Sequence, residues 1–138
     1  MAWYHDYGDK WNAHDAGGVV AFMTSDAVYE DLALGARHVG HDDIRGFIDG
    51  MSDRISSDYA FEFAEPIAST DEGYALEWVM RGTHDGAGGQ LPPTGKAFSI
   101  HGVSVGRLKE AKIAENRDYW SLGGFLVQIG ILGPIDGA

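Results

Sequence analysis

The sequence predicts an α+β fold in which helices from the first part of the chain cover one face of a curled sheet. Two observations predict it. Apolar residues recur at helical spacing in the first third of the chain, but they alternate with a period of two from Tyr59 onward. The later strands are long and joined by short turns, so they are expected to pair, twist and curl. A curled sheet with helices over its concave face encloses a conical cavity.

Three helices are predicted within the first 55 residues. The first is an amphipathic helix in the first dozen residues, whose aromatic side chains recur at helical spacing: Trp3, Tyr4, Tyr7 and Trp11. Asp15 is a suitable N-cap for a second, short helix over 19–23. The third helix is predicted over 41–55, with acidic residues in its first turn and one apolar stripe formed by Ile44, Phe47, Ile48, Met51 and Ile55.

Alternating apolar residues and turn signals predict the strands. They are expected over 27–31, 35–39, 59–64, 74–84, 98–108 and 112–120. A loop with two prolines is expected over 86–95, and the segment from Ser121 is expected to be a short helix or tail that closes a pocket or joins a partner. The whole chain, 1–138, is expected to be one domain, because its length leaves no room for two.

Composition and charge exclude several classes of function. The net charge is −11 and no basic cluster is present, so neither nucleic acid nor an anionic membrane is an expected partner. The chain contains no cysteine, which excludes disulfides, thiolate metal sites and cysteine nucleophiles. No apolar run approaches the length of a membrane span, and the start lacks a basic leader followed by an apolar stretch. We therefore expect a cytoplasmic protein.

Asp118, on the last predicted strand, is the strongest candidate for chemistry. Strand alternation places it on the same face as Asn116 and Trp120. On a partly apolar face, desolvation raises the pKa of a carboxyl toward a value useful for proton transfer. The alternative is a solvated or salt-bridged aspartate without a catalytic role.

His101 is the histidine considered for the same cavity. A simple hairpin centred on Glu110 places Ser104 on the face of Asp118 and His101 on the opposite face. A one-residue bulge would bring His101 into the pocket as a base. Three other histidines are expected at the surface or as helix caps: His38, His41 and His84. Because no HxH or HExxH spacing occurs, no metal site is expected.

Aromatic residues are abundant for so short a chain and fit either core packing or an apolar binding cavity. The candidates to line a cavity are Tyr7, Trp11, Tyr29, Phe47, Trp78, Phe98 and Trp120. Tyr29 and Trp120 are the preferred ones, because an O–H or N–H group in a pocket can donate to a substrate oxygen.

Short segments in the same order along nearly the whole chain resemble the SnoaL-like polyketide cyclases, a branch of the nuclear-transport-factor-2-like (NTF2-like) superfamily. They are WNAHD (11–15), VYED (28–31), GHDDIRGF (40–47), RGTHDG (81–86), PPTGK (92–96), KIAE (112–115) and LVQIG (126–130). This resemblance implies an NTF2-like cone, in which a curved mixed or antiparallel sheet has N-terminal helices over its concave face. It also implies a homodimer.

The resemblance implies a role for Asp118, because in these cyclases an acid just after a KI-x-E segment serves as acid/base. We therefore expect an enzyme without a cofactor that acts on a small apolar carbonyl-bearing molecule, by aldol-type cyclisation or by isomerisation. The expected substrate-binding residues are Tyr29, Trp78, His101, Asn116 and Trp120. The chain departs from the family pattern at Asn116-Arg117, where many members have His-Trp, and this departure puts the specific cyclisation in doubt.

Two alternatives remain open. Asn116-Arg117-Asp118 also resembles the limonene-epoxide-hydrolase branch, in which two acids and an arginine activate a water, and Asp31 or Glu77 would supply the second acid. The other alternative is an NTF2-like domain that binds a ligand without catalysis.

Overall fold

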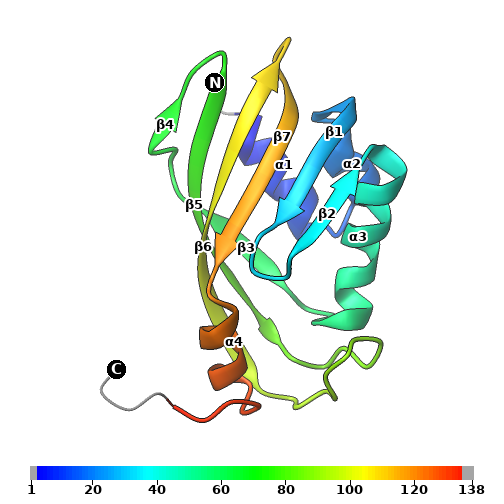
Figure 1. Ribbon diagram of the computed structural model, residues 1–138, viewed down its shortest axis with the longest axis vertical. Coiled ribbons are helices and arrows are strands. Elements are labelled where there is room, and N and C mark those ends of the chain that lie inside the picture. Colours follow the sequence, from blue (N-terminus) through cyan, green and yellow to red (C-terminus); the bar gives the residue numbers. More distant parts are fainter. Residues whose placement is uncertain (1–2, 135–138) are drawn as a thin grey trace.

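The computed structural model describes residues 3–134 and confirms the α+β prediction (Figure 1). In chain order the elements are α1 (Trp3–Asn12), α2 (Ala16–Val20), β1 (Met23–Asp31), β2 (Ala36–Val39), α3 (His41–Arg54), β3 (Ala60–Phe63), β4 (Ala68–Ser69), β5 (Gly73–Thr83), β6 (Ala97–Lys109), β7 (Lys112–Trp120) and α4 (Leu122–Gln128). The predicted first helix included Met1 and Ala2, which lie outside the described residues.

The position of α2 differs from the prediction over 19–23. Asp15 is its N-cap, as expected, and the carboxylate accepts a hydrogen bond from the Gly18 N–H at 2.9 Å. A cap bonds to the second or third helical residue, so the helix begins at Ala16. It therefore ends early enough for β1 to begin at Met23.

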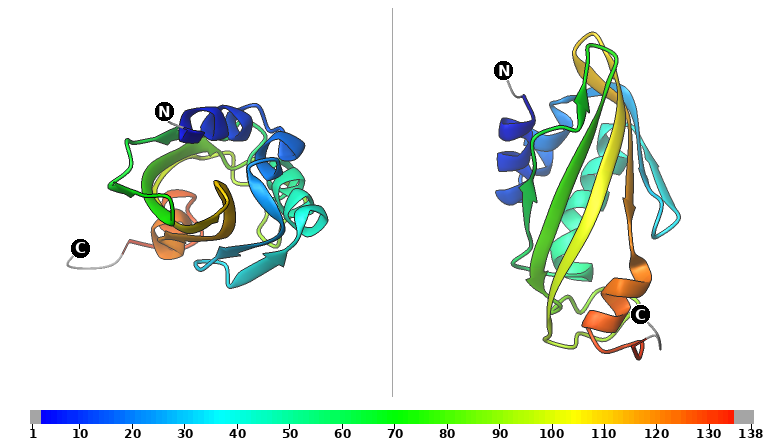
Figure 2. Two further views of the ribbon diagram at one scale, coloured as in Figure 1. Left: turned by 90° about the horizontal axis from the view of Figure 1, so that it is seen from above. Right: turned by 90° about the vertical axis from the view of Figure 1, so that its left-hand side faces the viewer.

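The sheet has the strand order β2-β1-β7-β6-β5-β3, with β4 paired to β5. β1 runs parallel to β7, whereas the other described pairs are antiparallel, so the sheet is mixed. It curls strongly around one side of the molecule (Figure 2). The parallel pairing places Tyr29 beside Asn116 and Asp31 beside Asp118 on neighbouring strands.

Two cross-strand pairs of a glycine and an aromatic residue shape the concave face of the sheet. Trp78 of β5 is opposite Gly102 of β6, and Tyr74 is opposite Gly106. A Cβ atom at either glycine would collide with the ring of its partner. The glycines therefore allow both rings to lie across the neighbouring strand, which is a recognised reason for glycine inside a strand.

Helices cover the concave face, where the core is formed. α1 packs on β3, α3 packs on β1 and β2, and α4 packs on β6. α4 is also fastened to β6 by Gln128, whose side chain accepts from the Ser99 N–H at 2.6 Å and donates to the Ser99 carbonyl at 2.9 Å. Between residues 3 and 134, none of the helices has the length and apolar character needed to cross a bilayer.

Candidate active site

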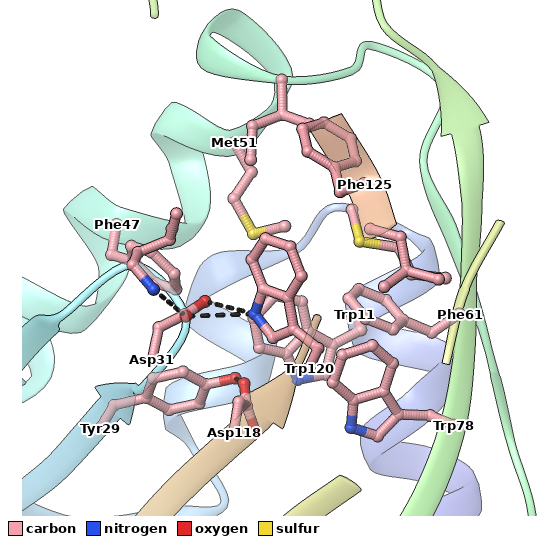
Figure 3. A pocket seen from close by; sticks show the side chains of 14 residues that line it. Trp11, Tyr29, Asp31, Phe47, Met51, Phe61, Trp78, Asp118, Trp120 and Phe125 are labelled. Carbon is pink, nitrogen blue, oxygen red and sulfur yellow. Dashed lines mark hydrogen bonds between the residues drawn. The ribbon is translucent and has the colours of Figure 1, made fainter. Parts of the chain in front are cut away.

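A cavity lies between the concave face of the sheet and the helices (Figure 3). The space inside it that is open to the centre of a water-sized sphere is about 40 Å³, so the cavity is narrow. Two carboxylates stand among aromatic and aliphatic side chains. The lining residues are Trp11, Tyr29, Asp31, Leu34, Phe47, Met51, Ile55, Phe61, Trp78, Met80, Ile100, Asp118, Trp120 and Phe125.

The Asp118 carboxylate, on β7, accepts three hydrogen bonds from side chains. Its Oδ1 accepts from Ser104 Oγ at 2.6 Å and from Asn116 Nδ2 at 2.8 Å. Its Oδ2 accepts from the Tyr29 hydroxyl. Only 8% of the residue is exposed. Since each carboxylate oxygen has two lone-pair sites, Oδ1 is fully occupied and Oδ2 keeps one site free.

Two of these donors are themselves held by the aromatic rings that lie over glycines. Trp78 Nε1 donates to Ser104 Oγ at 2.9 Å, and the Tyr74 hydroxyl donates to Asn116 Oδ1 at 2.6 Å. The orientation of both donors to Asp118 therefore depends on rings that fit only because glycine is opposite them.

Burial raises the pKa of Asp118 to about 6. The hydrogen bonds from Ser104, Tyr29 and Asn116 favour the ionised form and limit the rise, while the negative charge of Asp31 adds to it. A carboxyl with this pKa exchanges its proton readily near neutral pH, which is the property required of a general acid or base.

Asp31 is the second buried carboxylate of the cavity and is 6% exposed. It accepts from the Leu34 N–H at 3.0 Å and, through both oxygens, from Trp120 Nε1 at 3.1 Å (Figure 3). Burial raises the pKa of Asp31, and these donors oppose the rise. The two carboxyls are brought together because β1 and β7 are parallel neighbours in this register.

The structure brings four of the six expected site residues to the cavity: Tyr29, Trp78, Asp118 and Trp120. Asn116 is buried and hydrogen-bonded to Asp118, but it is not among the lining residues. Asn116 is therefore better placed to orient Asp118 than to contact a ligand directly.

The expectation that His101 enters the pocket is wrong. The hairpin has a register shift between Arg107 and Leu108, and beyond it Ser104 pairs with Asp118. The simple hairpin pairs Ser104 with Asn116, so the observed register differs by two residues and leaves every side chain on its original face. His101 is therefore exposed on the convex face.

His84 also differs from expectation, because it is 1% exposed and not a surface residue. Among the aromatic candidates, Tyr7 and Phe98 are buried in the core but do not line the cavity. Sequence reasoning missed Phe61 and Phe125 as lining residues. For Phe61 a signal existed, since it lies on the apolar face of the alternating segment 59–64.

Arg117 and Glu77 do not join the two acids. Arg117 forms an ion pair with Glu30 at 3.7 Å, and Glu77 is exposed. Neither lines the cavity. Within 3–134, no three His, Asp or Glu side chains gather in a way that could hold a metal ion.

Comparison with known proteins places the chain in a family. The sequence model for the SnoaL-like polyketide cyclases matches residues 2–129. The chain belongs to the SnoaL-like polyketide cyclase family. Among curated proteins, none is significantly similar to it in sequence.

Solved structures resemble this SnoaL-like protein over most of its length. A protein with a ketosteroid isomerase-like fold from Catenulispora acidiphila, in complex with trimethylamine, is 20% identical, with a TM-score of 0.80 over 94% of this chain and 92% of the other. AclR, a putative hydroxylase from Streptomyces galilaeus, is 25% identical, with a TM-score of 0.78 over 99% and 87%. A putative polyketide cyclase from Xanthomonas campestris is 19% identical, with a TM-score of 0.76 over 92% and 93%. The NTF2-like fold is therefore confirmed.

Proposed function

We propose that this SnoaL-like protein is a cofactor-independent acid/base enzyme that acts on a small, apolar, carbonyl-bearing molecule by aldol-type cyclisation or by isomerisation. One observation carries the proposal: the buried carboxyl of Asp118, with a pKa raised to about 6, lines a cavity of aromatic side chains. An aromatic cavity suits an apolar substrate, and this pKa suits proton transfer.

Ionised Asp118 is the base in this mechanism. The free lone pair of Oδ2 takes a proton from the carbon next to the substrate carbonyl, and the C–H electrons form an enolate. The Tyr29 hydroxyl already donates to Oδ2. Once Oδ2 carries the proton, it is a weaker acceptor, so the Tyr29 O–H is available to donate to the enolate oxygen.

The enolate then has two outcomes. In cyclisation, its carbon attacks a second carbonyl of the same molecule, one C–C bond forms, and protonated Asp118 returns its proton to the new alkoxide. In isomerisation, Asp118 returns the proton to a different carbon of the extended enolate. Both routes regenerate ionised Asp118 and require no redox partner.

The proton-abstraction step is tested with 2-tetralone, an apolar bicyclic ketone, in D₂O. Proton NMR measures how fast deuterium replaces hydrogen beside the carbonyl. We expect the wild-type protein to accelerate exchange, Asp118→Asn to abolish the acceleration, and the rate to rise with pH as Asp118 ionises. Undiminished exchange by Asp118→Asn contradicts the assigned role. A protein that binds the ketone without accelerating exchange fits a ligand-binding domain instead.

Epoxide hydrolysis is the second candidate, and one observation favours it: Asp31 supplies a second buried carboxylate in the same cavity. The outward position of Arg117 speaks against it, because that mechanism uses an arginine with the two acids. Incorporation of ¹⁸O from labelled water into a diol product distinguishes this chemistry from cyclisation and isomerisation.

We further propose that the chain forms a homodimer through the convex face of its sheet. Val105 and Tyr119 are 44% and 42% exposed on this face. Exposed apolar side chains that lie together favour a contact with a partner, because the contact removes them from water. Size-exclusion chromatography with light scattering should give twice the 14.9 kDa chain mass for the wild-type protein, and the monomer mass for Val105→Glu.

A further inference from the structure

A second hollow opens beside the mouth of the aromatic cavity. This groove is lined by Leu34, Arg54, Ile55, His84, Gly89, Gln90, Leu91, Trp120, Leu122, Phe125 and Leu126. The groove and the cavity share four lining residues, which are Leu34, Ile55, Trp120 and Phe125. One elongated ligand can therefore occupy both spaces.

Arg54, at the end of α3, supplies a cation to this groove. Its Nη2 donates to the Phe47 carbonyl at 2.9 Å, and its guanidinium carbon lies 5.6 Å from the centre of the Phe47 ring. The guanidinium also lies over Gly50, where a Cβ would collide with it. These contacts hold the group in place, and they leave most of its five N–H donors available.

No carboxylate among residues 3–134 lies within ion-pair distance of Arg54, although acidic residues outnumber basic residues by 21 to 10 in the chain. Most other arginines have such a partner: Arg45, Arg81, Arg107 and Arg117. A fixed guanidinium without an anion, at the edge of an apolar groove, is suited to an anion supplied by a ligand.

His84 adds a second donor to the groove. The Thr94 N–H donates to its Nδ1 at 3.2 Å, so the neutral ring carries its own proton on Nε2. The described residues provide no acceptor for this Nε2–H. The ring is fixed edge-on to Phe125, with 5.8 Å between ring centres.

We propose that this groove binds the far end of the substrate, and that this end carries a carboxylate. The substrate is then an elongated amphiphile, with an apolar carbonyl-bearing body in the aromatic cavity, a hydrocarbon stretch against Leu91 and Leu122, and a carboxylate at Arg54 and His84. The inference rests on the proposed function only in assigning the reacting end to the cavity.

The test measures binding alone, by isothermal titration calorimetry with two matched probes. One is 3-(2-naphthoyl)propionic acid, an apolar aryl ketone with a carboxylate tail, and the other is its uncharged methyl ester. We expect the wild-type protein to bind the acid about tenfold more tightly, which corresponds to about 1.4 kcal/mol. The preference should shrink as sodium chloride is added, because salt screens the ion pair.

Arg54→Gln and Arg54→Met should bind both probes with equal affinity; the second variant retains apolar volume if the first is poorly folded. Arg45→Gln is the control, since Arg45 is on the same helix but pairs with Asp42. It should keep the wild-type preference, and so should Asp118→Asn, which separates this inference from the catalytic one. A wild-type protein without a preference for the acid, whether through equal binding or no binding, overturns the proposal. A preference that survives loss of Arg54 also overturns it.

Discussion

Asp118→Asn should change the stability of the protein in a pH-dependent way. In the folded protein the pKa of Asp118 is about 6, against an ordinary value of 3.8. Between these values the native state binds more protons than the unfolded state, so a rise in pH lowers the free energy of unfolding. The stability contributed by this group is fully present below about pH 4 and is lost as pH rises through 6.

The size of this effect follows from the shift. At about 1.36 kcal/mol per pKa unit, the ionised carboxylate costs the folded wild-type protein about 3 kcal/mol at pH 7.5. Asparagine has no such cost at any pH. Urea unfolding of both proteins at several pH values between 4 and 7.5 should show Asp118→Asn gaining about 2.5 kcal/mol relative to wild type over that range, because the unfolded carboxyl is already partly ionised at pH 4. A constant offset from altered hydrogen bonds does not affect this slope.

Asp58→Asn provides a control of opposite sign. Asp58 accepts from the Thr83 N–H and from Ser56 Oγ, each at 2.8 Å, and the first of these bonds is the main cause of its lowered pKa. Its variant should therefore be least stable relative to wild type at neutral pH and approach wild type as pH falls. If the stability difference between wild type and Asp118→Asn is the same at pH 4 and pH 7.5, Asp118 does not have a raised pKa and the catalytic argument fails.

Three further outcomes are expected. Ser104→Ala removes a charge-assisted hydrogen bond worth about 1.5–3 kcal/mol, so the pKa of Asp118 should rise by at least about one unit. The pH at which 2-tetralone exchange reaches half its maximal rate should rise by the same amount, and an unchanged pH contradicts this prediction. Tyr29→Phe should lower the exchange rate about 100-fold or more, as loss of an oxyanion donor does elsewhere; wild-type exchange argues against Tyr29 as that donor. Gly106→Ala should destabilise the protein by about 1–3 kcal/mol, because the added methyl collides with the Tyr74 ring; thermal unfolding at the wild-type temperature would show that the ring can move aside.

Local periodicity was enough to predict one face of the site. In a strand, side chains alternate, so Asp118 and Trp120 could be assigned to the same side, and an assumed simple hairpin added Ser104 to it. The same parity argument placed His101 on the opposite face, and the structure agrees, since the two-residue shift in register preserves parity. The one-residue bulge is present between Arg107 and Leu108, but the turn is centred between Glu110 and Ala111 instead of on Glu110, so the two offsets add up to two residues and His101 stays outside the pocket.

The partnership of Asp31 with Asp118 was beyond the reach of such reasoning. It depends on β1 lying parallel to β7, although the two strands are separated by most of the chain. No turn connects them, so no loop length or turn residue indicates their register. The roles of Gly102 and Gly106 could not be predicted for the same reason. Each glycine is needed only because an aromatic ring from the neighbouring strand packs over it.

The two carboxylates of the cavity have different surroundings, and this difference favours Asp118 as the proton carrier. The Asp31 carboxylate accepts from Trp120 Nε1 through both oxygens and from the Leu34 N–H through one of them. Fixed N–H donors therefore already use its lone pairs. Asp118 has one free site on Oδ2, and the hydroxyl donor beside it can turn to another acceptor. Asp31 instead raises the pKa of Asp118 through its negative charge. Removing that charge with Asp31→Asn should therefore lower the pH at which exchange by Asp118 begins, while leaving Asp118 able to carry the proton.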